Sequence, residues 1–181
     1  MKKILLSAAL VAITATVGFA PNANAASGTI TFNGKVLSST CTVSNGTAGN
    51  VAVTLPDVPF SAFTASGSVA GLTPFSLSLT GCPTTPSGVV VGAAFSGASI
   101  DSTNAGTIKN TVGAGFSNVN IQMTDASGTP INLSTNPNPV TATLAGSTAT
   151  LSYEAQYYQP TSTAITAGTV TASVTYTLTY N

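Results

Sequence analysis

The sequence contains no histidine and no arginine, so all four of its cations are lysines. Without histidine, neither a Ser-His-Asp nor a Cys-His catalytic site can form. Beyond the first three residues the only cations are Lys35 and Lys109, and two cations cannot neutralise many phosphates, which argues against nucleic-acid binding. Its four carboxylates are far apart in sequence: Asp57, Asp101, Asp125 and Glu154. The three aspartates adjoin turn residues. We therefore expect no enzyme, no cofactor and no metal site.

The chain also contains few charged residues of either sign. Charged residues make up 4% of the sequence, so electrostatic repulsion does little to keep copies of the protein apart. A surface of this kind suits a protein that meets copies of itself.

The N-terminus has the pattern of a secretory signal peptide. Lys2 and Lys3 precede an apolar run over 4–19, and the small-residue pattern Ala23-Asn24-Ala25 follows. This order predicts a signal peptide over 1–25, with cleavage after Ala25 and export of the remainder. The alternative is a transmembrane anchor, which is disfavoured because the run is short and ends in a cleavage pattern. Residues 26–181 are enough for one domain with a real core.

The chain contains two cysteines, Cys41 and Cys82. An even number of cysteines in an exported protein predicts a disulfide. The alternative is a metal-binding pair, but the two cysteines are not in a CxxC spacing and no histidine could complete the site.

Signals for helices are nearly absent from the rest of the chain. Short alternating runs rich in Val, Thr and Ser are separated by clusters of Gly, Pro and Asn, which is typical of an all-β sandwich. The predicted strands lie at 28–37, 51–55, 75–80, 89–95, 119–123, 131–133, 151–157 and 170–180. We expect loops at 44–50, 57–72, 96–118 and 134–148, and a short helical turn near 60–65.

The last predicted strand carries the strongest pattern. Apolar residues occupy every second position from Val170 to Tyr180, with Thr or Ser between them, and no hairpin follows. This predicts an uncovered sheet edge, while the strand at 28–37 has no obvious partner. Both are satisfied if one molecule's strand 28–37 pairs with the next molecule's edge, which builds an open filament. Closure of strand 28–37 onto its own last strand is the alternative.

The chain resembles subunits of chaperone–usher fimbriae, in particular the major shaft pilins of type 1 and P pili. The resemblance is carried by several motifs in order: 28–36 followed by Cys41, then 77–82, then 155–158, then Gly168 at the fourteenth position from the end and the penultimate Tyr180. One departure is the short lead of Ala26-Ser27 before the first motif.

The resemblance implies an incomplete immunoglobulin-like sandwich that lacks its last strand and is completed by a donor strand from a neighbouring subunit. It divides the exported chain into a donor-strand extension over 26–37 and a pilin domain over 38–181. The implied donor residues are Ile30, Phe32, Gly34 and Val36. The implied acceptor groove, which is also the chaperone-binding strand, consists of Gly168, Val170, Ala172, Val174, Tyr176, Leu178 and Tyr180.

The implied partners are identical or homologous pilins, a periplasmic chaperone and an outer-membrane usher. The implied destination is a fimbria on the cell surface that supports adhesion. The alternatives are a minor fimbrial subunit and an adhesive carbohydrate-binding β-sandwich. A fimbrial adhesin should carry a separate lectin domain, for which 26–181 leaves no room.

Overall fold

The computed structural model describes residues 28–112, 118–135 and 140–181, and the chain divides into two units, residues 1–35 and 36–181. In the second unit the strands are β1 (Thr42–Val43), β2 (Val69–Thr80), β3 (Val90–Ser96), β4 (Ile100–Asp101), β5 (Thr107–Ile108), β6 (Asn120–Asp125), β7 (Thr141–Thr143), β8 (Ala149–Tyr158) and β9 (Thr175–Tyr180). A 3-10 turn, η1, spans Phe60–Ala62 and confirms the predicted helical turn.

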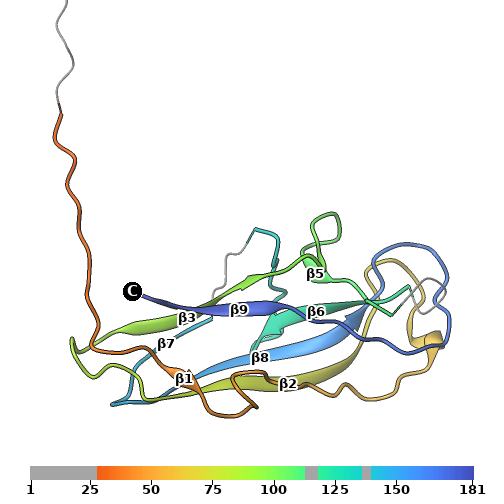
Figure 1. Ribbon diagram of the computed structural model, residues 1–181. Coiled ribbons are helices and arrows are strands. Elements are labelled where there is room, and N and C mark those ends of the chain that lie inside the picture. The colour runs from red at the N-terminus through yellow and green to blue at the C-terminus, as the bar shows by residue number, and fades with distance from the viewer. Residues whose placement is uncertain (1–27, 113–117, 136–139) are drawn as a thin grey trace, which may run out of the picture. The chain divides into compact units, whose positions relative to one another are not determined.

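The strands form two antiparallel sheets that face each other (Figure 1). The larger sheet has the order β1-β2-β8-β6-β5-β4, and the smaller has the order β7-β3-β9. The predicted all-β sandwich is therefore confirmed. Within the described residues, no helix is both long and apolar enough to cross a bilayer.

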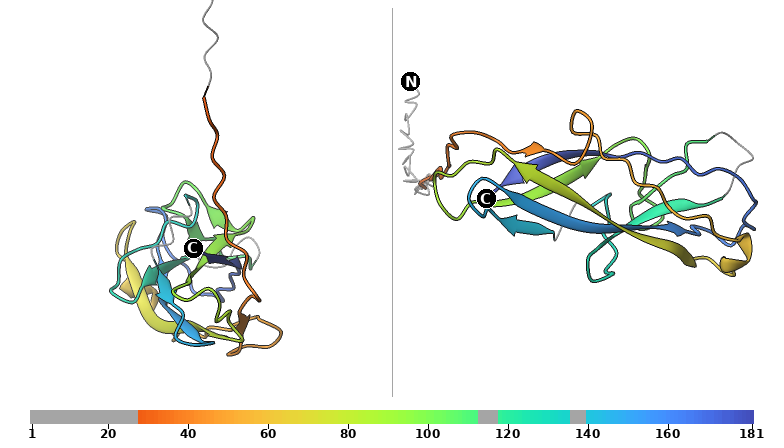
Figure 2. Two further views of the ribbon diagram at one scale, coloured as in Figure 1. Left: turned by 90° about the vertical axis from the view of Figure 1, so that its left-hand side faces the viewer. Right: turned by 90° about the horizontal axis from the view of Figure 1, so that it is seen from below.

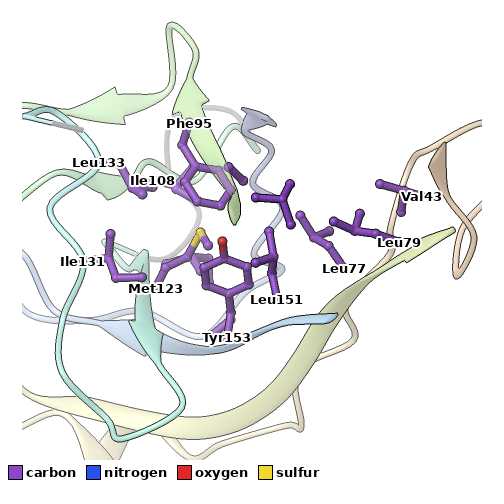
Figure 3. Packing of buried hydrophobic residues seen from close by; sticks show 14 of the residues in the cluster. Val43, Leu77, Leu79, Phe95, Ile108, Met123, Ile131, Leu133, Leu151 and Tyr153 are labelled. Atoms are coloured by element: carbon purple, nitrogen blue, oxygen red, sulfur yellow. The ribbon is translucent and has the colours of Figure 1, made fainter. Parts of the chain in front are cut away.

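The core lies between the sheets and is built from the alternating apolar residues of β2, β3, β6 and β8 (Figure 3). Tyr153 of β8 is 1% exposed and lies at its centre. Its ring stacks on Phe75 of β2 at 5.5 Å between centroids and meets Phe95 of β3 edge-on at 5.6 Å. Aromatic contacts of this kind add to the stabilisation from buried area and join the two sheets.

The long ladder between β2 and β8 is interrupted by a bulge between Ala70 and Thr73. Gly71 lies in this bulge with a φ of +70°, and a Cβ atom there would be 3.0 Å from the ring of Tyr157. Glycine is therefore required both for its backbone conformation and for the close approach of the ring. The bulge breaks the alternation, which is why the start of β2 fell in a predicted loop.

Several predicted strands are wrong in extent. Residues 51–55, 131–133 and 170–174 form no strand, whereas β4, β5 and β7 fall inside predicted loops. Residues 28–37 are not assigned to a strand either, but their predicted pairing is with a neighbouring molecule and stays a prediction. The physical reason is that alternation reports which side chains are buried, whereas a ladder also needs a partner at hydrogen-bonding distance. Ile131 and Leu133 are fully buried, for example, although their backbone follows β6 only irregularly.

The predicted limits 1–25, 26–37 and 38–181 remain predictions. The predicted signal peptide and Ala26-Ser27 lie outside the described residues.

Candidate functional site: an apolar groove beside the edge strand

A cavity of about 1210 Å³ opens between two extended segments of the second unit. The first wall is the segment 48–58, which follows β1, and the second wall is the segment 165–176, which leads into β9. Figure 2 (right) shows these two segments running along the same side of the sandwich. We refer to this cavity as the groove.

The floor of the groove is the hydrophobic core itself. It is lined by Leu77 of β2, Phe95 of β3 and Met123 of β6, which are otherwise buried core residues. Of the described residues that line the groove, Asp57 is the only charged one. The groove is therefore suited to an extended, apolar peptide and not to a charged ligand.

The second wall is extended but only partly paired. β9 is the outer strand of its sheet, and its ladder with β3 ends at Thr175. Further back, Thr171 is held by the loop after β5: its carbonyl accepts from the Thr111 N–H at 2.7 Å, and its N–H donates to the Asn110 Oδ1 at 2.9 Å. Because successive residues of an extended chain direct their backbone groups to opposite sides, those of Val170 and Ala172 are directed away from this loop.

The first wall is also extended and lacks a ladder. Val51, Val53 and Leu55 are half-buried and alternate with exposed residues, yet the described residues provide no ladder for this segment. It begins at a tight turn in which Gly49 has a φ of +81°, a conformation that favours glycine. The two walls thus present two extended edges to the same groove.

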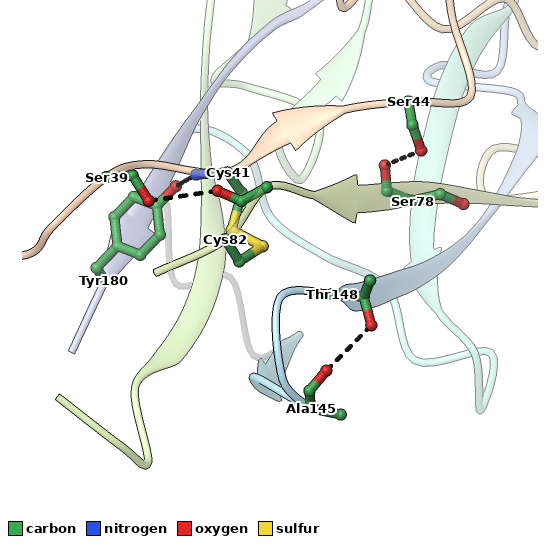
Figure 4. Close-up of a disulfide and its surroundings, with 9 residues drawn as sticks. Ser39, Cys41, Ser44, Ser78, Cys82, Ala145, Thr148 and Tyr180 are labelled. Carbon is green, nitrogen blue, oxygen red and sulfur yellow. Dashed lines mark hydrogen bonds between the residues drawn. A yellow bond between two sulfur atoms is a disulfide. The ribbon is translucent and has the colours of Figure 1, made fainter. Parts of the chain in front are cut away.

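Two tyrosines of β9 form hydrogen bonds to residues on either side of β1. The Tyr176 hydroxyl donates to the carbonyl of Gly49, and burial raises the pKa of Tyr176, which keeps this proton in place. The Tyr180 hydroxyl accepts from the Cys41 N–H at 2.7 Å (Figure 4). The first bond joins the two walls at one end of the groove, and the second ties β9 to the residue before β1 beyond that end.

The predicted disulfide between Cys41 and Cys82 is confirmed and lies at this same end (Figure 4). It joins the residue before β1 to the segment that follows β2. Asn181 exchanges two backbone hydrogen bonds with Val90 of β3, at 2.9 and 3.0 Å, which holds the end of β9 in the smaller sheet. This end of the second unit is therefore held by a covalent bond and by backbone pairing.

The structure brings most of the predicted acceptor residues into the groove. The members of the predicted acceptor set that line it are Gly168, Val170, Ala172, Val174 and Tyr176. Leu178 and Tyr180 lie beyond it in β9, half-buried against the core. Sequence reasoning missed the first wall, because the alternation of Val51, Val53 and Leu55 was interpreted as an ordinary paired strand.

The large apolar side chains among the predicted donor residues are exposed. Ile30 is 79% exposed, Phe32 90% and Val36 93%, which is unusual for large apolar side chains that alternate along one face. A Cβ atom at Gly34 would meet nothing within 4 Å. In the parts of the chain that the structure describes, no group of three or more His, Cys, Asp or Glu side chains could hold a metal ion.

Comparisons with known proteins agree on one family. The model of the fimbrial protein family matches residues 30–181. The major fimbrial subunit SMF-1 of Stenotrophomonas maltophilia is 40% identical over 88% of this chain and 95% of that protein. The F17 fimbrial protein of Escherichia coli is 37% identical over 84% of this chain and 87% of that protein.

A solved structure shows the same fold. The crystal structure of the P pilus rod subunit is similar with a TM-score of 0.60 and 21% identity, over 79% of this chain and 100% of that chain. The family match and the two relatives show that the chain belongs to the fimbrial protein family and is a structural subunit of a pilus, and the sandwich fold agrees with this.

Proposed function

We propose that the subunit polymerises by donor-strand complementation, in which residues 28–37 of one molecule fill the groove of the next. The observation that carries the proposal is that one segment of the chain lacks a strand partner while a groove of the same chain lacks a strand. The chain has an exposed apolar segment without a ladder, and it has an apolar groove whose two extended walls lack a strand between them. An extended peptide that pairs with both walls would complete the sandwich.

The two features agree in length and in chemistry. Residues 168–176 of the second wall and residues 28–36 each cover eight residue steps, or roughly 26 Å of extended chain. In the filled groove Ile30, Phe32 and Val36 face the apolar floor, and each contributes about 1.5–3 kcal/mol of burial. Gly34 lies where the donor backbone approaches the groove closely. The alternate residues, Thr29, Thr31, Asn33 and Lys35, face solvent.

The walls supply the backbone partners. The N–H and C=O groups of Val170, Ala172 and Val174 are directed toward the donor strand, and each ladder bond adds about 0.5–1.5 kcal/mol. A subunit whose groove is empty exposes its core and is prone to aggregate. We therefore propose that a periplasmic chaperone covers the groove before assembly, and that an outer-membrane usher exchanges the chaperone's strand for the donor strand of the next subunit. The product is a fimbria on the cell surface.

Three versions of the mature chain test this proposal. One is intact, one lacks 26–37, and one lacks 26–37 but carries a copy of 28–37 after Asn181 on a flexible Gly/Ser linker. The tethered strand has a high effective concentration at its own groove, so the third version should be a monomer with a raised melting temperature. The deletion should accept a donor but not be one, and it should shorten the polymers of intact protein in a mixture.

The matched control carries the same linker and a copy of 28–37 in which Ile30, Phe32 and Val36 are replaced by Ser. It should melt like the deletion, because the groove gains no apolar side chains. An intact protein that is already a monomer and melts as high as the version with the appended strand would instead show that 28–37 closes onto its own domain, and donor-strand complementation would be excluded.

A further inference from the structure

The sequence contains two Asn-Gly pairs, Asn33-Gly34 and Asn45-Gly46, and they lie in opposite environments. Asn33 and Gly34 are exposed, and no strand includes them. Given the proposed function, on which this inference rests, we propose that Asn33 is a site of spontaneous deamidation, and that its isoaspartate product removes donor ability from subunits that remain unassembled. The assembled subunit is protected, and the groove of the modified subunit stays intact.

The chemistry needs only water. The backbone nitrogen of Gly34 attacks the Cγ atom of Asn33, a new C–N bond closes a five-membered succinimide, and the side-chain nitrogen leaves as ammonia with the proton from the Gly34 N–H. Water then opens the ring at either carbonyl and yields aspartate or isoaspartate at position 33. Glycine favours the attack because it has no Cβ to shield the nitrogen and because its backbone rotates freely.

The second pair shows what protection requires. Asn45 Nδ2 donates to the Ser76 carbonyl at 2.7 Å, and Asn45 Oδ1 accepts from the Ser78 N–H at 2.8 Å, so both ends of its amide are held on β2. Gly46 is confined as well, since a Cβ atom there would lie 2.2 Å from the carbonyl oxygen of Asn50. The Asn45 Cγ therefore cannot turn toward the Gly46 nitrogen, and this pair is an internal control within the same molecule.

The two products affect the donor strand differently. Aspartate adds a charge on the face that carries Thr31 and Lys35, which is directed to solvent in the filled groove. Isoaspartate inserts a methylene group into the backbone between Phe32 and Gly34. Because side chains alternate with a period of two residues, this insertion removes Val36 from the register set by Ile30 and Phe32. A subunit with isoaspartate at position 33 can therefore still accept a donor but cannot serve as one.

Assembly prevents the reaction. A donor strand between two walls has its backbone N–H groups engaged in ladders, so the Gly34 nitrogen is no longer available for attack. Its extended conformation also holds the nitrogen away from the Asn33 Cγ. The lifetime of the free Asn33 amide therefore limits the time for which an exported subunit can extend a polymer.

The test incubates the purified mature subunit at mildly alkaline pH and follows both asparagines by peptide mass spectrometry, with isoaspartyl methyltransferase labelling to identify isoaspartate. Asn33 should lose its amide while Asn45 keeps it, and fibres incubated in parallel should keep both. The aged subunit, mixed with fresh subunit, should shorten the polymers seen by electron microscopy. The control variant Asn33→Gln keeps a neutral amide but must close a six-membered ring, so after the same incubation it should polymerise like fresh protein.

Equal conversion of Asn33 and Asn45 would overturn the inference, and so would subunits with isoaspartate at position 33 that extend polymers as fully as fresh ones. Both results leave the proposed function in place, provided that fresh subunit polymerises. Fresh subunit that does not polymerise at all would overturn the proposed function and, with it, the effect of Asn33 on assembly, whatever the mass spectra show.

Discussion

The replacement Phe32→Ala tests the donor strand with a side chain whose surroundings change completely on assembly. In the single chain Phe32 is 90% exposed, so its truncation should leave the stability of the unfilled subunit unchanged. In the filled groove the ring would lie against core residues such as Leu77 and Phe95. Removing a buried phenylalanine costs about 3–5 kcal/mol from lost transfer energy and the remaining cavity. For a joint between subunits this corresponds to a weakening of roughly two to four orders of magnitude.

The measurement is the free energy of unfolding in denaturant for the version that carries 28–37 after Asn181. Phe32→Ala and Thr31→Ala are each introduced into the appended copy. Thr31 lies on the opposite face of the strand, so its truncation should cost much less than that of Phe32. Equal losses from the two replacements, or no loss from Phe32→Ala, would refute the inward orientation of Phe32 and with it the alternation on which the joint is built.

Two further predictions concern the stability of the domain. Replacing both Cys41 and Cys82 with Ser releases a loop of 41 residues and should lower the free energy of unfolding by about 4 kcal/mol; a melting temperature equal to that of the oxidised protein would contradict this. Burial alone would raise the pKa of Asp101, but hydrogen bonds from Thr103, Asn104 and Asn120 outweigh it and lower the pKa from 3.8 to about 2. Asp101 therefore contributes stability of roughly 2 kcal/mol that is fully present above pH 4 and is lost as the pH falls toward 2. Unfolding curves of Asp101→Asn should lack this acid-dependent loss, and an unchanged pH profile would exclude the assignment.

Much of the core could be predicted from alternation alone. The predicted strands 75–80, 119–123 and 151–157 each place apolar residues at alternate positions, and all of the following are buried: Leu77, Leu79, Met123, Leu151 and Tyr153. This succeeds because a residue's side of a strand follows from its position in a period of two, whichever strand lies beside it. The disulfide was predictable for a similar reason, since two cysteines in an exported chain have one pairing.

Which segments pair with one another, and which sheet edges stay unpaired, could not be predicted in the same way. The alternation over 170–180 looks uniform, yet only Thr175–Tyr180 finds a ladder, on β3, while Thr171 is held by Asn110 and Thr111. Val51, Val53 and Leu55 have the pattern of a strand, but no described strand lies beside them.

The sequence by itself determined which side chains are apolar, on which face of each segment they lie, and that the segment 28–37 carries an apolar face like those of the core strands. The tertiary structure decided that the first wall and the second wall lie on either side of one groove, and that Tyr176 ties them together at one end. The physical reason is that side-chain burial is a local property of the chain, whereas a groove exists only where segments about a hundred residues apart meet, and their packing leaves out the strand that would lie between them.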